Sequence, residues 1–489
     1  MRSKLQVGPL LGLESEQLYT VCFSTDKNVT EAKVNLNGRS VRALKVGETN
    51  GCLFWRAEHE EPPHTSAKLV RYNISVDGDV AISRHNQSEW TFYVPALNEP
   101  PRFAYASCNG FSSADLVNKT DEPYALWEKM KASHSKEPFS LLLMGGDQLY
   151  ADEMWGSVPT LKSWGKKSRK KRVQSAFSQT MQQQVERFYD DLYRQRWSDI
   201  NMAEMYASIP SVMMWDDHDI FDGWGSYPDD LHTCDVFQGI FNTAKQFFEL
   251  FQIRSNKNQS LLNGAAGHYA LGFGFRGYHI LALDNRGERT LEQVMSQQQW
   301  KDLIKYLDER ATQGHLLLLS AVPVVYRDFS FSESALDVTP WEEELTDDLK
   351  DHWRAKEHQG ERARLIMRLL KNHQTRSGKT VILSGDVHIG CLGVINDRCN
   401  GQRIHQIVSS GIVHPAPSRI AWLGIMAVTN DKKEYLNEDH SIEISMLQPY
   451  HSDKYLRSRN FVALQEGTDQ KLWAQWVCES KDKPIYPLN

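Results

Sequence analysis

Three short acidic clusters in this chain of 489 residues each follow an apolar run of the kind that forms a buried strand. Carboxylates and histidines at the carboxyl ends of several strands suit a metal site, and open α/β sheets bind ligands at that edge. Three such clusters in one chain predict a polynuclear metal centre that performs hydrolysis. The clusters are GGDQLYAD at 145–152, WDDHD at 215–219 and SGDVH at 384–388, after the apolar runs 139–144, 209–215 and 380–383.

The first cluster offers two candidate ligands. Asp147 follows two glycines that end an apolar strand, so its carboxylate can reach over the sheet edge and bridge two cations. Two metals about 3.5–4 Å apart can clamp the attacking and leaving oxygens of a displacement. Tyr150 is either a core tyrosine or a phenolate ligand, and the latter needs a strongly acidic metal because a free phenol has a pKa of about 10.

Cys108 ends the apolar run 103–107 and precedes Asn109 and Gly110. A lone cysteine is ordinarily a small buried thiol. Beside other ligands at strand ends it is a candidate thiolate ligand. A set of thiolate, phenolate and carboxylate suits ferric iron better than magnesium.

The other two clusters add carboxylates and histidines. Asp217 and His218 are adjacent after a strand, so one can coordinate metal while the next faces substrate. His218 is then a candidate general acid, because its pKa lies nearest neutrality; the alternative is a histidine that only bonds to its acidic neighbours. Asp386 and His388 are two residues apart, a spacing that allows both to face the same ligand.

The elements that position these residues follow from patterning. Residues 1–98 alternate apolar and polar side chains between turn residues, which predicts a small all-β sandwich. The motif NEPP at 98–101 is a candidate linker. Beyond it, apolar runs alternate with helical periods over 101–489, which predicts an α/β sheet domain, with the tail from about 421 completing a sheet through a hairpin at 459–477. Helices are expected at 122–133, 180–207, 235–252, 296–312 and 360–372, and further strands at 278–284, 316–320 and 379–384.

A basic run, WGKKSRKKR, occupies 164–172. The favoured interpretation is a solvated, mobile surface loop. The alternatives are an electropositive flap that attracts a phosphate ester and a nuclear-localisation patch, a motif that often occurs by chance.

Composition argues against a nucleic-acid-binding, membrane or disulfide-rich protein. A hydrophobic content of 40%, a charged content of 24% and a net charge of −6 are typical of a globular protein with no strong nucleic-acid or membrane signal. Seven cysteines without a CxxC pair argue against a disulfide framework. Without a signal peptide or long apolar run in this sequence, a cytoplasmic location is expected. Composition does not predict the oligomeric state.

In their order along the chain, these motifs resemble the PhoD-like (alkaline phosphatase D) branch of the calcineurin-like metallophosphoesterases. The resemblance covers roughly 101–415, and the opening VGPLxG at 7–12 resembles the β-sandwich that precedes the catalytic domain in that family. The matching segments are ASC at 106–108, GDQxYxD at 146–152, WDDHD at 215–219, LDNR at 283–286, QW at 299–300, Pro323, Trp353 with Glu361 and Arg362, SGDVH at 384–388 and SSG at 409–411.

The resemblance implies a four-layer α/β sandwich domain, preceded by the small all-β sandwich, with a dinuclear centre of ferric iron and calcium. Manganese or zinc are alternatives. By motif, Cys108, Tyr150 and His388 would hold iron, Asp147 would bridge, and Asp217 and Asp386 would serve calcium, which takes oxygen ligands. His218 would contact phosphate or protonate the leaving group. Arg286 would bind phosphate oxygens or, as the alternative, form a salt bridge to Asp284.

Two segments depart from the family pattern. The family often carries asparagines after its acidic motif, whereas this chain has IFDGW at 220–224, where Asp222 is a candidate substitute. The usual Asp-Thr-Arg is here Asp284-Asn285-Arg286.

The expected function is phosphoester hydrolysis, in which a metal-bound hydroxide attacks a phosphate monoester or diester. The alternative is a non-catalytic, metal-containing binding or scaffold protein, because one fold can host unrelated functions. Loops at 151–180, 222–235 and 325–352 are expected to shape the pocket, and the sequence does not predict the substrate.

Overall fold

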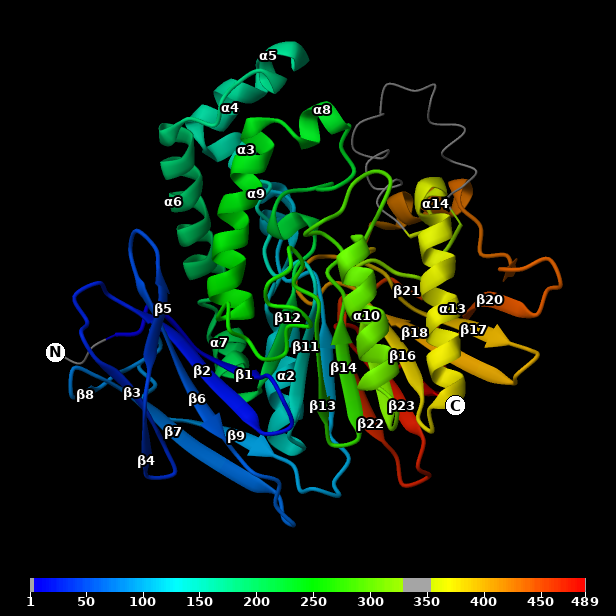
Figure 1. Ribbon diagram of the computed structural model, residues 1–489, viewed down its shortest axis with the longest axis horizontal. Helices are drawn as coiled ribbons and strands as arrows, with labels where there is room; N and C mark the ends of the chain where they lie inside the picture. Colours follow the sequence, from blue (N-terminus) through cyan, green and yellow to red (C-terminus); the bar gives the residue numbers. More distant parts are fainter. Residues whose placement is uncertain (1–3, 329–352, 489) are drawn as a thin grey trace.

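The computed structural model describes residues 4–328 and 353–488, so most of the predicted loop at 325–352 lies outside the described residues. The described chain is a mixed α/β protein with three sheets (Figure 1). The ten-stranded sheet has the order β24-β23-β22-β10-β11-β12-β1-β2-β6-β5, the nine-stranded sheet contains β13-β14-β15-β16-β18-β17-β20-β19 with β21 on β17, and the five-stranded sheet contains β4-β3-β7-β8 with β9 on β7.

Parallel strands lie at the centre of the two larger sheets and confirm the strands predicted from apolar runs. In the ten-stranded sheet β10 pairs with β11 and β11 with β12; in the nine-stranded sheet β14, β15, β16 and β18 pair in turn. Continuous apolar sequence suits such strands because both faces are covered. Their bounds are Phe103–Ala106 (β10), Leu141–Gly145 (β11), Ser211–Met214 (β12), Tyr278–Ala282 (β14), His315–Leu319 (β15), Thr380–Ser384 (β16) and Gln402–Val408 (β18).

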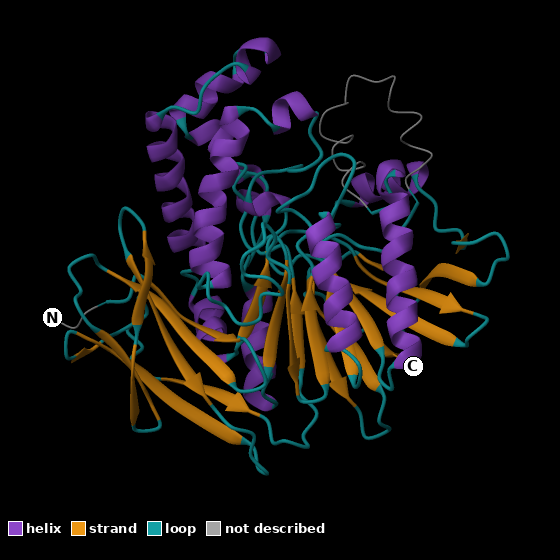
Figure 2. Ribbon diagram, viewed as in Figure 1, coloured by secondary structure: helices purple, strands orange, loops and turns teal. Residues whose placement is uncertain are grey.

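The two larger sheets pack against each other through one hydrophobic cluster that includes Leu143, Ile280 and Leu383. The rings of Phe103 and Tyr278 meet there at 4.9 Å between centroids. Because the sheets face each other, loops that follow their parallel strands converge between the two groups of helices (Figure 2).

The predicted helices are present and cover the larger sheets. Buried side chains at Met181, Val185, Tyr189 and Leu192 give α6 its inward face. The helical period predicted over 180–207 is two helices, because the Asp199 side chain accepts hydrogen bonds from the first turn of a new helix. The bounds are Ala125–Lys136 (α2), Gln179–Arg196 (α6), Ile200–Ser208 (α7), Asp235–Phe248 (α9), Gln297–Glu309 (α10) and Gln359–Thr375 (α13).

The N-terminal strands divide between two sheets. β1 pairs in parallel with β12 at Gly12 and Ser211, so β1, β2, β6 and β5 continue the ten-stranded sheet. The remaining N-terminal strands form the five-stranded sheet. Hydrogen bonding therefore runs across the predicted boundary near residue 98, which stays a prediction. The bounds are Val7–Leu13 (β1), Leu18–Thr25 (β2), Ala32–Leu36 (β3), Arg39–Arg42 (β4), Leu44–Glu48 (β5), Leu53–Glu60 (β6), Lys68–Val76 (β7), Asp79–Val80 (β8) and Trp90–Val94 (β9).

The C-terminal part completes both larger sheets. The predicted hairpin is present as β22 and β23, and β22 pairs with β10. The bounds are Leu271–Phe275 (β13), Gly390–Asp397 (β17), Glu434–Tyr435 (β19), Ile442–Leu447 (β20), Tyr455–Leu456 (β21), Asn460–Glu466 (β22), Leu472–Cys478 (β23) and Ile485–Leu488 (β24).

The basic run at 164–172 was predicted as a surface loop; this is correct for 166–168, which link two helices, and wrong for the rest of the run. It lies at the end of α4 (Pro159–Gly165) and in α5 (Arg169–Val173), whose Arg169 pairs with Asp230 at 2.7 Å. The exposed face of α5 keeps the charges in solvent, which is compatible with helix as well as loop. In the described parts of the chain, no helix is long and apolar enough to cross a membrane.

Candidate metal centre

The predicted ligands lie on loops that leave the carboxyl ends of β10, β11, β12 and β16. Four of them adopt left-handed backbone: φ is +52° at Cys108, +53° at Asp147, +65° at Asp386 and +52° at His388. Non-glycine residues adopt this conformation at a cost, and functional sites are where it concentrates. Gly146 permits the close packing, since a Cβ there would lie 3.0 Å from the Asp216 Cβ.

One group of potential ligand atoms joins three of these loops. Atoms of Cys108, Asp147 and His388 lie within 4.8 Å of one another. The Tyr150 hydroxyl lies 3.2 Å from Asp147 Oδ2 and 3.0 Å from His388 Nε2. The structure thus brings together the thiol, phenol, carboxyl and imidazole that the resemblance assigns to iron.

Two further groups of potential ligand atoms share one carboxylate, that of Asp217. Asp147, Asp217 and His218 form one, and Asp216, Asp217 and Asp386 form the other, again within 4.8 Å. Asp147 belongs to two of the three groups, which is the position that a bridging ligand needs. Asp216 joins the site although no metal role was predicted for it. Asp222 belongs to none of the three groups, and its side chain is 45% exposed.

The environment of the Asp147 carboxylate tests whether these residues fit a metal. Asp147 is buried, and its Oδ1 has no hydrogen-bond partner. Burial raises its pKa well above the usual range; His218 opposes the rise, and the neighbouring aspartates add to it. An unpartnered buried acceptor is costly, and a cation would satisfy it. The donor set and this orphaned oxygen fit a metal centre.

The thiol and phenol need such a cation to ionise. Burial, with the charge of Asp147 adding to it, raises the pKa of both Cys108 and Tyr150 well above their usual ranges. Both groups are therefore neutral at neutral pH in the metal-free protein. A bound metal inverts this preference, because it deprotonates a coordinating thiol.

His218 lies between the metal ligands and a carboxylate that holds it. Its Nδ1 is 2.7 Å from Asp152 Oδ2, and Asp152 Oδ1 accepts the Asp222 N–H at 2.8 Å. Burial would lower the His218 pKa, but the carboxylates of Asp152, Asp217 and Asp147 outweigh it and hold the pKa well above the usual range. Asp152 stands in the first acidic cluster, but no role was predicted for it.

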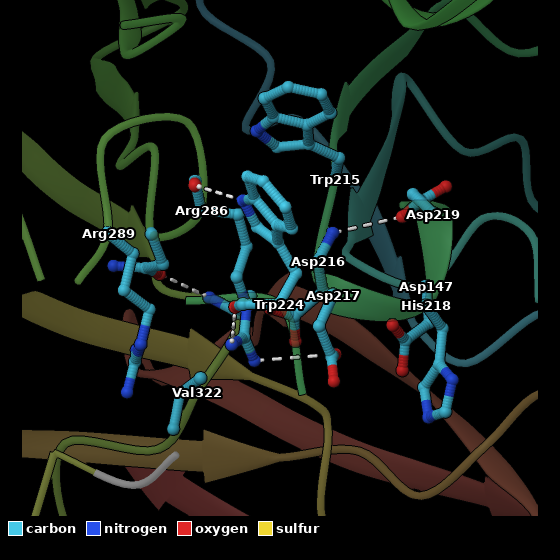
Figure 3. Close-up of polar contacts among 12 residues, drawn as sticks. Asp147, Trp215, Asp216, Asp217, His218, Asp219, Trp224, Arg286, Arg289 and Val322 are labelled. Carbon is cyan, nitrogen blue, oxygen red and sulfur yellow. Dashed lines mark hydrogen bonds and ion pairs between the residues drawn. The ribbon is translucent and has the colours of Figure 1, made fainter. Parts of the chain in front are cut away.

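Arg286 is fully buried beside the acidic strand end (Figure 3). Its Nε donates to Asp216, its Nη2 lies 3.3 Å from Asp217 Oδ1, and its Nη1 donates to the Trp224 carbonyl at 3.1 Å. The alternative partner, Asp284, accepts the Trp215 indole N–H at 2.8 Å and the backbone N–H of Arg286 at 3.1 Å. The predicted phosphate contact of Arg286 stays a prediction.

Two residues near the ligands had no predicted role. The Asp219 carboxylate accepts four hydrogen bonds: from the backbone N–H groups of Gln148, Leu149 and Asp216, which lie in the loops after β11 and β12, and from the Gln252 side-chain amide. His414 stacks on His388 with ring centroids 3.7 Å apart. Asp219 is the last residue of the WDDHD motif, so the sequence could have identified it as a site residue. His414 follows the SSG motif by three residues, but a lone histidine is not enough to predict a place in the site.

Comparison with known proteins gives a family for this site. A profile described as PhoD related phosphatase matches residues 80–341 and 334–443. The uncharacterized protein YGR266W of Saccharomyces cerevisiae is 26% identical in an alignment 417 residues long, which covers 73% of this chain and 58% of that protein. The chain thus spans somewhat more than half the length of this relative.

Two solved structures share the fold. The structure of PhoD has a TM-score of 0.63 and 15% identity, covering 100% of this chain and 91% of that one. Purple acid phosphatase PPD1 from yellow lupin (Lupinus luteus) seeds has a TM-score of 0.53 and 11% identity, covering 98% and 73%. With the profile match over more than half of its residues, the chain belongs to the PhoD related phosphatase family and is a PhoD-like metallophosphoesterase in fold.

Proposed function

We propose that this protein is a metal-dependent phosphoesterase that hydrolyses phosphate monoesters, diesters or both. The observation that carries the proposal is the buried Asp147 carboxylate, which two ligand groups share and whose Oδ1 has no partner. Family membership supports the same reaction class. The packed sheets and their flanking helices support the four-layer sandwich as the finer fold, with the N-terminal strands as an all-β appendage.

The residues divide between two metal positions. Cys108, Tyr150 and His388 would hold ferric iron, Asp147 would be shared, and Asp217 and Asp386 would serve calcium; manganese or zinc are alternatives. Thiolate and phenolate favour a strongly acidic ion on one side, and oxygen ligands favour a hard divalent ion on the other. When bound, such a pair supplies Lewis acidity and positive charge for a displacement at phosphorus.

His218 is the proposed general acid. Its Nδ1 is held by Asp152, so its Nε2 is the nitrogen that can give a proton to the departing alkoxide. The high pKa imposed by the surrounding carboxylates keeps the imidazole protonated at neutral pH in the metal-free protein. Asp152 therefore fixes the orientation of the ring and, with Asp217 and Asp147, favours its protonated form.

The buried Arg286 side chain forms ion pairs with two carboxylates of the candidate metal centre. Through Asp216 and Asp217 its guanidinium fixes two carboxylates of the third ligand group. A direct contact between Arg286 and phosphate would require the guanidinium to leave Asp217. We propose that its described ion pairs position the ligands and that phosphate binding is its second role.

Hydrolysis of an aryl phosphate monoester and diester tests the proposal. The full chain is loaded separately with iron and calcium, manganese or zinc, and product release is measured against the metal-free protein. Turnover in at least one metal condition is expected. A chain that binds metal but turns over neither ester in any condition is instead the non-catalytic scaffold protein.

A further inference from the structure

The segment that begins with the SSG motif contacts the backbone of two candidate ligands. The Ser410 hydroxyl donates to the His388 carbonyl at 2.8 Å, and the backbone N–H of His414 donates to the Cys108 carbonyl at 3.1 Å. A Cβ at Gly411 would lie 2.4 Å from the His414 carbonyl oxygen, so this tight turn needs glycine. The turn therefore brings His414 back to the candidate metal centre.

The ring of His414 lies nearly parallel to the rings of two candidate ligands. Its centroid is 3.7 Å from that of His388, with 12° between the planes, and 5.2 Å from that of Tyr150, with 22° between the planes. The Tyr150 hydroxyl and His388 Nε2 lie 3.0 Å apart. Two such atoms can bind one metal only while both rings keep their orientations. Stacking against a fixed ring restricts rotation that the ring torsions alone leave broad.

Both nitrogens of the His414 ring already have partners. Nδ1 is 3.0 Å from the Pro415 carbonyl oxygen, which can only accept, so Nδ1 carries a hydrogen. Nε2 is 3.1 Å from the Ser112 hydroxyl. His414 is 7% exposed and belongs to none of the three groups of potential ligand atoms found among the described residues. The ring therefore presents its face to the candidate ligands, and its two hydrogen bonds fix the plane of that face.

We propose that His414 is a positioning residue of the candidate metal centre. Its ring sets the orientations of Tyr150 and His388, so that the phenol oxygen and Nε2 can bind the same metal. Its backbone N–H holds the loop that carries Cys108. Removal of an outer residue that orients metal ligands typically lowers metal affinity by about 10–100-fold. This role rests on the proposed ligand set, but it does not require turnover.

Iron loading of the full chain tests this role. Phenolate or thiolate bound to ferric iron absorbs visible light, and the absorption maximum depends on how the ligands are oriented toward the metal. His414→Ala should shift that maximum and raise the rate at which a chelator removes iron by about tenfold or more. His414→Phe keeps an aromatic face, so it should retain the wild-type absorption and slow release. A merely structural role would lower thermal stability without moving the absorption.

Two further variants separate the ring from its surroundings. His414→Gln can still bond to Ser112 but has no ring, so it should behave like His414→Ala. It also carries the test if circular dichroism shows that the alanine variant does not fold. His440→Ala is the matched control, because His440 stacks on Tyr435 with centroids 4.2 Å apart and neither residue belongs to the candidate metal centre. This control should leave the absorption and the release rate unchanged.

Three results would overturn the positioning role. The first is an absorption and a release rate that stay those of wild type in His414→Ala or, if that variant does not fold, in His414→Gln. The second is a His414→Phe variant that loses iron as fast as the variants without a ring. The third is an iron-loaded wild type without visible absorption, which would contradict the ligand set as well. A wild type that absorbs but hydrolyses no ester would instead contradict the proposed function alone, and the shifts in the variants would still support the role of His414.

Discussion

In the metal-free protein, burial makes ionisation of the Asp147 carboxyl group unfavourable. A bound cation would offset this cost. The folded-state pKa of Asp147 is raised by burial, so the metal-free protein loses stability as pH rises through that value. The stabilising contribution of the protonated form is fully present below the unfolded pKa of about 4. The bound metal reverses this preference because it favours the carboxylate.

Asp147→Asn should therefore have opposite effects with and without metal. The metal-free variant should be as stable as the metal-free wild type or more stable at pH 7, and its stability should depend less on pH. With metal present, the variant should lose the thermal stabilisation that the wild type gains. Thermal unfolding of both proteins with chelator and with added metal measures these differences; equal stabilisation of both by metal would exclude a ligand role for Asp147.

Asp152→Asn should weaken the proposed general acid. Without the carboxylate at 2.7 Å, the His218 ring loses its orientation and its raised pKa. The kcat for an alkyl phosphate should fall about 100-fold, and that for an aryl phosphate with a good leaving group should fall much less. Exposed Asp115→Asn is the matched control. Equal losses on both esters would show that Asp152 does not act through leaving-group protonation.

At the scale of elements, hydrogen bonds to Asp219 join the loops that follow β11 and β12. Its carboxylate accepts two N–H groups from the first loop and one from the second, and burial raises its pKa to about 7. Because both loops carry candidate ligands, their separation depends on this carboxylate. Asp219 is thus a positioning residue.

Asp219→Ala leaves four buried donors without their acceptor, three backbone N–H groups and the Gln252 amide. The free energy of unfolding should fall by about 4 kcal/mol, at roughly 1 kcal/mol for each lost bond. Asp219→Asn keeps one acceptor oxygen and should lose less, while the metal affinity of both variants should fall. Chemical denaturation and metal titration measure the two effects. Asp222→Ala, at a side chain 45% exposed, should change the unfolding free energy little.

The residues at the strand ends could be predicted from sequence, but the side chains that they contact could not. Apolar runs before Asp147, Asp217 and Asp386 predicted strands, and ligands at strand ends predicted one metal site. That β16 belongs to a different sheet from β11 and β12, so that Asp386 reaches the site from the second sheet, was not predicted. Whether Arg286 contacts Asp284 or Asp216 depends on pairing between separate strands, which local pattern does not encode. The prediction of a loop over the whole basic run at 164–172 failed for a related reason. Charged side chains remain in solvent on an exposed helix as well as on a loop, so charge alone does not distinguish the two.

At the scale of the whole molecule, the N-terminal strands share hydrogen bonds with the α/β part of the chain. The Arg254 side chain donates to the carbonyls of Leu11 and Ser211 at 2.9 and 3.2 Å, and the Tyr72 hydroxyl donates to the Ala207 carbonyl at 2.6 Å. Alternating sequence predicted the strands in 1–98. It did not predict that four of them extend the larger sheet, because edge pairing is non-local.

Removal of residues 1–98 should therefore disrupt the remainder. The edge of β12 would lose β1, and an exposed apolar edge strand is prone to aggregate. The fragment 99–489 should be insoluble or unfold at markedly lower temperature than the full chain. Solubility and calorimetry measure this, and a soluble fragment with the thermal transition of the full chain would show that the N-terminal part folds independently.

Metal content measured by elemental analysis tests the central claim most directly. The purified full chain and Asp147→Asn are dialysed in parallel against metal-containing and then metal-free buffer. The wild type should retain two ions per chain, at least one of them a transition metal, while the folded variant should retain fewer. A wild-type chain that retains no transition metal, or a variant that retains as much as the wild type, would contradict a metal centre built on Asp147.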